Sequence, residues 1–143
     1  LAVGESYDIS ESITNLIDNY NIKDVFKWNN LFIPDEEISD YFSACDIVVL
    51  PYRTASQSGI VQIAYHFNKP VIVTNVGGLP EMIEIGKSGE IVEPEKPMEL
   101  AKMISHCLTE AKLVDMSIFI DSYKIKFSWQ SFTNKMLDFI SSI

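Results

Sequence analysis

The sequence predicts an α/β fold, a Rossmann-like three-layer structure in which a parallel sheet carries helices on both faces. Two kinds of pattern support this class. The apolar runs Ile47–Leu50 and Val71–Val73 are short and rich in β-branched residues, as are strands buried on both faces of a parallel sheet. Stretches with apolar residues at helical spacing lie between such runs, so strands and helices alternate along the chain.

The first part of the chain contains two expected strands and two expected helices. Leu1–Val3 is an apolar strand that ends at a glycine, and Val25–Trp28 is a second strand. Between them, Asp8–Tyr20 places its apolar residues on one stripe, as an amphipathic helix does. The run Pro34–Glu37 is a helix-start signal, because proline is followed by acidic residues that favour the first turn of a helix.

The rest of the chain continues the alternation. Continuous apolar runs predict strands at Ile47–Leu50, Val71–Thr74 and Glu90–Val92. Proline at the first helical position and apolar residues at helical spacing predict the helices. They are expected at about Ser58–Phe67, from Pro80 after the turn Asn75–Leu79, from Pro97, and through the chain after Met103.

Composition limits the classes of protein and partner. The 143 residues are expected to form one domain, residues 1–143. The net charge of -9 argues against nucleic acid and against an anionic membrane surface as main partners. Cys45 and Cys107 lack metal-ligand spacing, which predicts reduced thiols, no metal site and a cytoplasmic protein. The chain opens on the apolar strand LAVGE without methionine, from which we expect a piece of a longer polypeptide.

The stretch Ile47–Pro80 contains no Asp or Glu, although the chain carries 20. Burial in an α/β sheet accounts for part of this bias, but not for the exposed turn Tyr52–Gly59. Small residues that begin a helix after a parallel strand present N–H groups to an anion. The residues predicted to bind a diphosphate here are Arg53, Ser56, Gln57, Ser58 and Gly59. The open alternative is a plain N-cap, in which Ser56 or Ser58 binds no ligand.

Two polar residues follow on the helix, and a second loop follows the next strand. Gln62 lies in the first turn of the helix, close enough to reach a ligand, whereas His66 is interpreted as a hydrogen-bonded core histidine. The pair Gly77 and Gly78 permits positive φ and close backbone approach. Glu81 then either holds a ligand hydroxyl or complements the dipole of a helix.

A third candidate loop follows the strand at 25–28. Trp28 can stack on an aromatic ring and the backbone of Asn29 can contact its edge, with a core or lid tryptophan as the alternative. No Ser-His-Asp set, zinc site or P-loop is recognised, so no catalytic residue is assigned.

Several sequence blocks occur in the order of a known family. They are LAVGE, VFKW, IPDEEISDYFSACDIVVLPY, GIVQIAYHFNKPVIVTNVGGLPEMIEIGKSGEIVEP and KFSWQSF. In this order they resemble the donor-binding half of glycosyltransferase family 4, over essentially the whole chain. The resemblance implies a retaining enzyme of GT-B architecture that acts in polysaccharide biosynthesis. Residues 1–143 would be its C-terminal, nucleotide-sugar-binding domain.

The resemblance also implies partners. The substrate would be a nucleotide diphosphate sugar, and the acceptor a glycan or a lipid-linked molecule held by a missing N-terminal domain. No metal or other cofactor is expected, because basic side chains and helix N-termini neutralise the diphosphate in such folds. Peripheral membrane association would come only through the missing half. The C-terminal helix at about 128–143 would dock on that half, and its apolar face would otherwise promote self-association.

The sequence departs from the family pattern in two ways. A spaced pair of glutamates is typical around the sugar-binding turn, but those positions hold Ala55 and Ile63 in one alignment, Ser56 and Ala64 in another. The basic residues that hold the diphosphate lie upstream of Leu1 in the family. These departures leave two alternatives open: a nucleotide-sugar epimerase or hydrolase of the same fold, and a non-catalytic module that binds a nucleotide or a protein.

Overall fold

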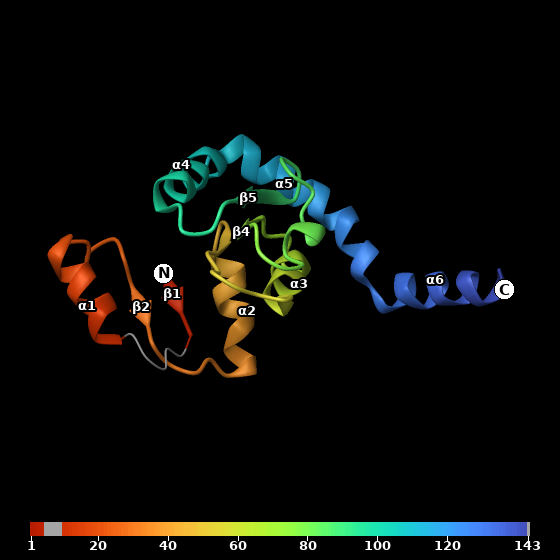
Figure 1. Cartoon of the computed structure of the whole chain (residues 1–143), viewed down its shortest axis with the longest axis horizontal. Helices are drawn as coiled ribbons and strands as arrows, with labels where there is room; N and C mark the ends of the chain where they lie inside the picture. The colour runs from red at the N-terminus through yellow and green to blue at the C-terminus, as the bar shows by residue number, and fades with distance from the viewer. Residues whose placement is uncertain (5–9, 143) are drawn as a thin grey trace. The chain divides into compact units, whose positions relative to one another are not determined.

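A computed structural model of the chain describes residues 1–4 and 10–142. Its elements, shown in Figure 1, belong to two compact units, residues 1–41 and residues 42–143. Hydrogen bonds divide the strands in the same way, into a two-stranded and a three-stranded sheet. Both sheets are parallel, and the predicted α/β class is confirmed.

The first unit contains β1 (Ala2–Val3), α1 (Ser10–Asn19), β2 (Trp28–Asn29) and most of α2 (Asp35–Ala44). Ala2 pairs with Trp28 in a parallel register. The strand predicted at Val25–Trp28 was placed too early. Val25 is 81% exposed and its N–H donates to the Ile22 carbonyl in a turn, so the chain becomes extended only at Trp28. Residues 5–9, where the predicted helix begins, lie outside the described residues.

The second unit contains the larger sheet and the remaining helices. Its strands are β3 (Val48–Leu50), β4 (Val71–Thr74) and β5 (Gly89–Val92), with β4 in the centre. Its α-helices are α3 (Gly59–His66), α4 (Pro97–Cys107), α5 (Glu110–Tyr123) and α6 (Trp129–Ser141). Two short 3₁₀ helices complete it, η1 (Pro80–Met82) and η2 (Lys124–Phe127). The alternation of strand and helix therefore follows the prediction closely.

Helices cover both faces of the three-stranded sheet. Side chains alternate along a strand, so Val71 and Val73 point to one face of β4 and pack with Tyr65 of α3. Ile72 points to the other face and packs with Cys107 of α4. Helix α5 contributes Ile120 to the first cluster and Met116 to the second. This arrangement gives the three predicted layers.

The buried hydroxyl of Tyr65 fixes the segment between η1 and β5. It donates to the Met82 carbonyl at 2.9 Å and lies 2.8 Å from Ser88 Oγ, which accepts from the Glu84 N–H at 2.9 Å. Burial raises the pKa of Tyr65, so the phenol stays neutral and can donate. The side chain at the centre of α3 therefore ties the helix to the segment that leads into β5.

The C-terminal end of α3 is closed by Asn68 in the left-handed conformation, with φ of 55°. The N–H groups of Asn68 and Lys69 return to the Tyr65 and Ala64 carbonyls, the bond pattern of a Schellman motif. Asparagine tolerates this conformation better than most side chains. The helix therefore stops in time for the chain to enter β4 at Val71.

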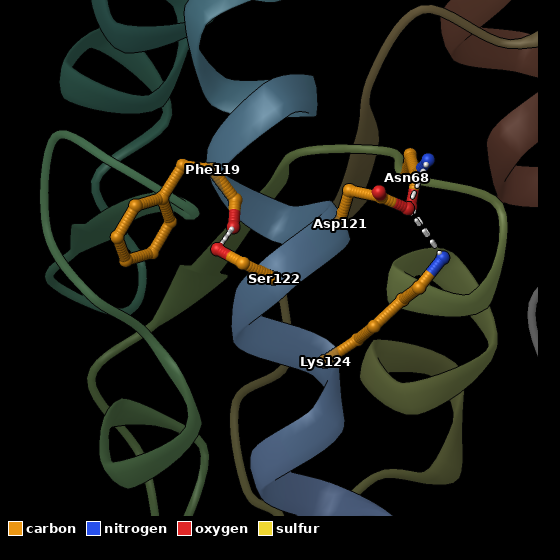
Figure 2. Close-up of polar contacts among 5 residues, drawn as sticks. All are labelled: Asn68, Phe119, Asp121, Ser122 and Lys124. Atoms are coloured by element: carbon orange, nitrogen blue, oxygen red, sulfur yellow. Dashed lines mark hydrogen bonds and ion pairs between the residues drawn. The ribbon is translucent and has the colours of Figure 1, made fainter.

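The Asn68 side chain also joins this turn to α5 (Figure 2). Its Nδ2 donates to Asp121 Oδ1 at 3.1 Å, and its Oδ1 accepts from Lys124 Nζ at 2.9 Å. Lys124 Nζ also lies 2.9 Å from Asp121 Oδ1. These contacts hold the pKa of Asp121 below its usual value, because the hydrogen bonds from Lys124 and Asn68 favour the ionised carboxylate. Figure 2 also shows Ser122 donating to the Phe119 carbonyl within α5.

The last helix, α6, begins at a standard N-cap. Ser128 Oγ accepts from the Ser131 N–H at 3.1 Å. No residue described in α6 is buried, and its large apolar side chains, Trp129, Phe132 and Phe139 among them, are exposed. Its docking on another domain stays a prediction. Among the described residues, no helix has the length and apolar character needed to span a bilayer.

Substituting Tyr65→Phe should lower the free energy of unfolding by about 1–3 kcal/mol, because Ser88 and the Met82 carbonyl lose a buried partner. Urea denaturation measures the change. Tyr123→Phe is the control, since the Tyr123 hydroxyl accepts from the exposed Lys126 at 3.4 Å and its loss should cost below about 0.5 kcal/mol. Equal losses in the two variants would contradict the buried network.

Substituting Asp121→Asn should lower stability in a pH-dependent way. Because the folded pKa of Asp121 is depressed, the advantage of the wild type should be present above the unfolded pKa of about 3.9. It should be lost as the pH falls through the lower folded value. Denaturation at several pH values measures it, with Asp115→Asn on the same helix as the control for net charge. A difference that persists undiminished below about pH 3 would contradict this.

Candidate functional site

Three loops meet at the carboxyl edge of the larger sheet, because β3, β4 and β5 are parallel and adjacent. Loop A is residues 51–58, between β3 and α3. Loop B is residues 75–79, between β4 and η1. Loop C is residues 93–96, between β5 and α4. In open parallel sheets this edge is where ligands bind.

Loops A and B touch through their backbones. The Gly78 N–H donates to the Ser56 carbonyl at 2.8 Å. A Cβ on Gly77 would lie 1.7 Å from the Ala55 carbonyl oxygen, and Gly77 has a φ of 52°. A Cβ on Gly78 would lie 2.9 Å from the Ser56 oxygen and 3.6 Å from the Gln57 side chain. The structure therefore brings Ser56 and Gln57 beside the glycine pair, and the pair is needed for this close approach.

Thr74, the last residue of β4, fixes the first part of loop A. It is 3% exposed, and its hydroxyl donates to the Tyr52 carbonyl at 2.6 Å and lies 3.4 Å from the Leu50 carbonyl. Thr74 was not among the residues predicted from the sequence. The available signal was a hydroxyl at the end of a buried apolar strand, since a buried polar group needs a partner.

The start of α3 carries a capped but open N-terminus. Ser58 is the N-cap, with extended backbone, and its Oγ accepts from the Ile60 N–H at 3.3 Å. Ser58 therefore caps α3, and its part in binding a diphosphate stays a prediction. The other N–H groups of the first turn have no carbonyl within the helix to which they can donate a hydrogen bond. Gly59 is exposed, and a Cβ there would meet nothing within 4 Å, so the helix start is sterically open.

Acidic residues of loop C reach both other loops. Glu95 Oε1 lies 3.5 Å from Arg53 Nε in loop A, and Glu93 Oε1 accepts from Asn75 Nδ2 in loop B at 2.9 Å. The stretch from Ile47 to Pro80 contains no Asp or Glu. In the folded protein, however, the carboxylates of Glu93 and Glu95 contact its loops. Glu95 itself adopts a left-handed backbone with φ of 59°.

A pocket of about 390 Å³ lies between loops A and C. Val92 and Leu100 provide apolar lining, and Arg53, Glu95 and Lys96 provide charged groups. Arg53 is thus associated with Glu95 and this pocket, whereas Ser56 and Gln57 lie against loop B. The predicted diphosphate-binding residues therefore fall into two groups within one loop.

The remaining predicted residues of the second unit are exposed. Gln62 lies on the outer side of α3, and Glu81 lies on η1 directly after loop B. His66, interpreted from the sequence as a core histidine, is exposed, so that interpretation is wrong. Its ring lies edge-on to Phe67, with ring centroids 5.0 Å apart, in the last turn of α3. The core positions of this helix are taken by Val61, Ala64 and Tyr65.

Trp28 and Asn29 belong to the first unit, where they form β2. Both are half-buried, and Asn29 Nδ2 donates to the Tyr41 hydroxyl at 3.1 Å. Their assignment to a ligand site stays a prediction.

Cysteine, histidine and acidic side chains are the candidate metal ligands of the chain. Cys45 and Cys107 are free thiols, as predicted, and burial raises the pKa of each. Among the side chains that the structure describes, no three His, Cys, Asp or Glu are grouped to hold a metal ion. Metal-free chemistry stays a prediction.

Comparison with known proteins identifies relatives. The family described as glycosyl transferases group 1 matches residues 1–110. D-inositol 3-phosphate glycosyltransferase of Corynebacterium jeikeium is 32% identical over 99 residues, which are 68% of this chain and 24% of that protein. An uncharacterized glycosyltransferase of Methanocaldococcus jannaschii is 27% identical over 96 residues, 66% of this chain and 27% of that protein. The chain spans about a quarter of the length of these curated relatives.

Solved structures share the fold. Sucrose-phosphate synthase of Thermosynechococcus elongatus superposes with a TM-score of 0.80 at 23% identity, over 98% of this chain and 37% of that one. The Anabaena protein HepE, solved in complex with UDP-glucose, superposes with a TM-score of 0.75 at 20% identity, over 99% of this chain and 40% of that one. These neighbours place the chain among GT-B folds.

Substituting Gly77→Ala should destabilise the protein by more than about 2 kcal/mol, because the new Cβ would clash with the Ala55 carbonyl in addition to the cost of positive φ. Gly86→Ala is the matched control. Gly86 has a φ of 77°, but its Cβ would meet nothing within 4 Å, so only the conformational cost of about 1 kcal/mol should appear. Urea denaturation compares the two. Equal losses would contradict the close contact of loops A and B.

Proposed function

The chain belongs to the group 1 glycosyltransferase family, and we propose that it binds the nucleotide diphosphate sugar of a retaining, family 4 enzyme. The parent protein would transfer the sugar to a glycan or a lipid-linked acceptor. The observation that carries this proposal is the joining of loops A and B beside the open start of α3, at the edge where a parallel sheet binds ligands.

The diphosphate would lie against the first turn of α3. Its N–H groups and the positive end of the helix dipole favour an anion there. The exposed Gly59 leaves room for close approach, and Ser56 and Gln57, which precede the helix, lie against Gly77 and Gly78. These groups and the buried N-cap Ser58 are the ones we propose for the diphosphate. Arg53 would add a charge-assisted contact from the other side of loop A. With these groups in place, we expect no metal ion to be needed.

The absence of the family's glutamate pair has a structural counterpart. Ala64 is fully buried in the apolar cluster beneath α3, so a carboxylate at that position could not reach a ligand. Ala55 is half-buried with its carbonyl against Gly77. The exposed amides of Gln57 and Gln62 and the carboxylate of Glu81 are the polar groups we propose for the sugar and ribose hydroxyls. Trp28 and Asn29 stay sequence-based candidates for contact with an aromatic ring.

The acceptor site is proposed to lie in another domain. Curated relatives are about two and a half to three times as long as this chain, and their length leaves room for such a domain. HepE, a structural neighbour, was solved with UDP-glucose, which supports a UDP-sugar as the first donor to test. Transfer needs both substrates held in one geometry, and such positioning contributes about 7–11 kcal/mol of barrier lowering.

Saturation-transfer NMR with a panel of UDP- and GDP-sugars tests the proposal. At least one nucleotide sugar should bind. Substituting Gly59→Val should weaken its binding by at least about tenfold, which corresponds to about 1.4 kcal/mol, because the branched side chain would occupy the open helix start. The fold should be kept, since a Cβ at Gly59 meets nothing within 4 Å.

Gly59→Ala is the control, because it also replaces the glycine but adds only a methyl group, and it should lower affinity less than valine does. Thermal denaturation of both variants verifies that the fold is intact. Undiminished affinity in the valine variant would move the phosphate site away from α3. If no nucleotide sugar bound the wild type, the proposed function would be lost.

A further inference from the structure

We propose that Glu95 holds Arg53 in the pocket between loops A and C, and that a phosphate ligand of the site binds by displacing Glu95 from Arg53. The inference rests on the proposed function, because it concerns how an anion reaches the same loop. Glu95 would then be a positioning residue, which sets the affinity of the site through the arginine and does not itself touch the ligand.

Arg53 is the single arginine of the chain. The other basic side chain between Ile47 and Pro80, apart from histidine, is Lys69, which donates to the Ser43 carbonyl and lines a different pocket before β4. Lys69 therefore lies at the amino end of the strands, opposite to the loops. Arg53 is the cation that this stretch places at their carboxyl ends.

The contact between Arg53 and Glu95 is open enough to exchange. It joins Nε to one carboxylate oxygen at 3.5 Å, and the side chains are 82% and 68% exposed. Exposed pairs of this kind contribute little net stability. A phosphate group can instead accept two parallel hydrogen bonds from a guanidinium, a stronger and more directional contact. A diphosphate can therefore replace Glu95, at a small cost.

The position of Glu95 is set by its backbone. Loop C turns sharply between β5 and α4, and Glu95 has a φ of 59°, a conformation that few L-residues adopt. Its carboxylate is thereby presented to Arg53 across the pocket that both line. Glu93, in the same loop, is engaged with Asn75 and provides an internal comparison.

The test measures ligand affinity and the arginine signal together. Because the chain has one arginine, its Nε–Hε group gives one NMR signal. Each protein is titrated with UDP, inorganic pyrophosphate and uridine. The proteins are the wild type, the single variants Glu95→Gln, Glu93→Gln and Arg53→Gln, and the double variant that combines Arg53→Gln with Glu95→Gln. Glu93→Gln removes the same charge from the same loop but leaves an oxygen to accept from Asn75.

We expect Glu95→Gln to bind UDP and pyrophosphate about two- to fivefold more tightly, the range for an exposed ion pair, with uridine unchanged. The gain should be absent in the Arg53→Gln background, and Glu93→Gln should bind like the wild type. The Nε signal should shift in Glu95→Gln before any ligand is added.

Other results would overturn the inference. Equal or weaker UDP binding by Glu95→Gln would reject the displacement while leaving the nucleotide site intact. A gain that survives in the Arg53→Gln background, or that Glu93→Gln reproduces, would assign the effect to general charge. If no variant bound UDP or pyrophosphate, the proposed function and the displacement would fall together, an outcome distinct from the others.

Discussion

Strand β4 is buried along its whole length and hydrogen-bonded to a parallel neighbour on each side. The backbone N–H and C=O groups of a strand in that position must form hydrogen bonds with both neighbouring strands. Its side chains must pack against the helices on both faces of the sheet. Strand β5 can lie this close to β4 only because Gly89 opposes Val71, where a Cβ would lie 2.0 Å from the Val71 oxygen. With β4 so constrained, the carboxyl ends of three strands meet, and loops A, B and C are neighbours by necessity.

The loops then depend on a second constraint, the contact of two backbones. Gly77 and Gly78 allow loop B to lie against the carbonyls of Ala55 and Ser56, and the hydroxyl of Thr74 holds the start of loop A from beneath. Loop A is thus supported from β4 and from loop B, while the start of α3 stays open. Because loop A is held in place while the start of α3 is sterically open, the site is suited to a ligand that approaches the backbone closely.

The parts predicted well from sequence were those with strong local signals. Buried strands, the proline-led helices and the start of α3 at Ser58 follow from hydrophobic patterning and capping, which act within a few residues. The strand at 25–28 and the burial of His66 were predicted wrongly. At 25–28 a local turn decided, since the Val25 N–H bonds to the Ile22 carbonyl. At His66 tertiary packing decided, since α3 turns Val61, Ala64 and Tyr65 toward the sheet instead. Contacts between loops, such as Arg53 with Glu95, carry no local signal at all.

The charge of the site shows why such contacts matter. From sequence, the absence of carboxylates between Ile47 and Pro80 indicates a region prepared for an anion. In the fold, Glu93 and Glu95 return from loop C to the two loops of that region. An exposed carboxylate beside the single arginine lowers the local positive potential without removing the cation. The charge along loop A and the start of α3 therefore combines the dipole of that helix with an exposed ion pair whose carboxylate comes from a residue distant in the sequence.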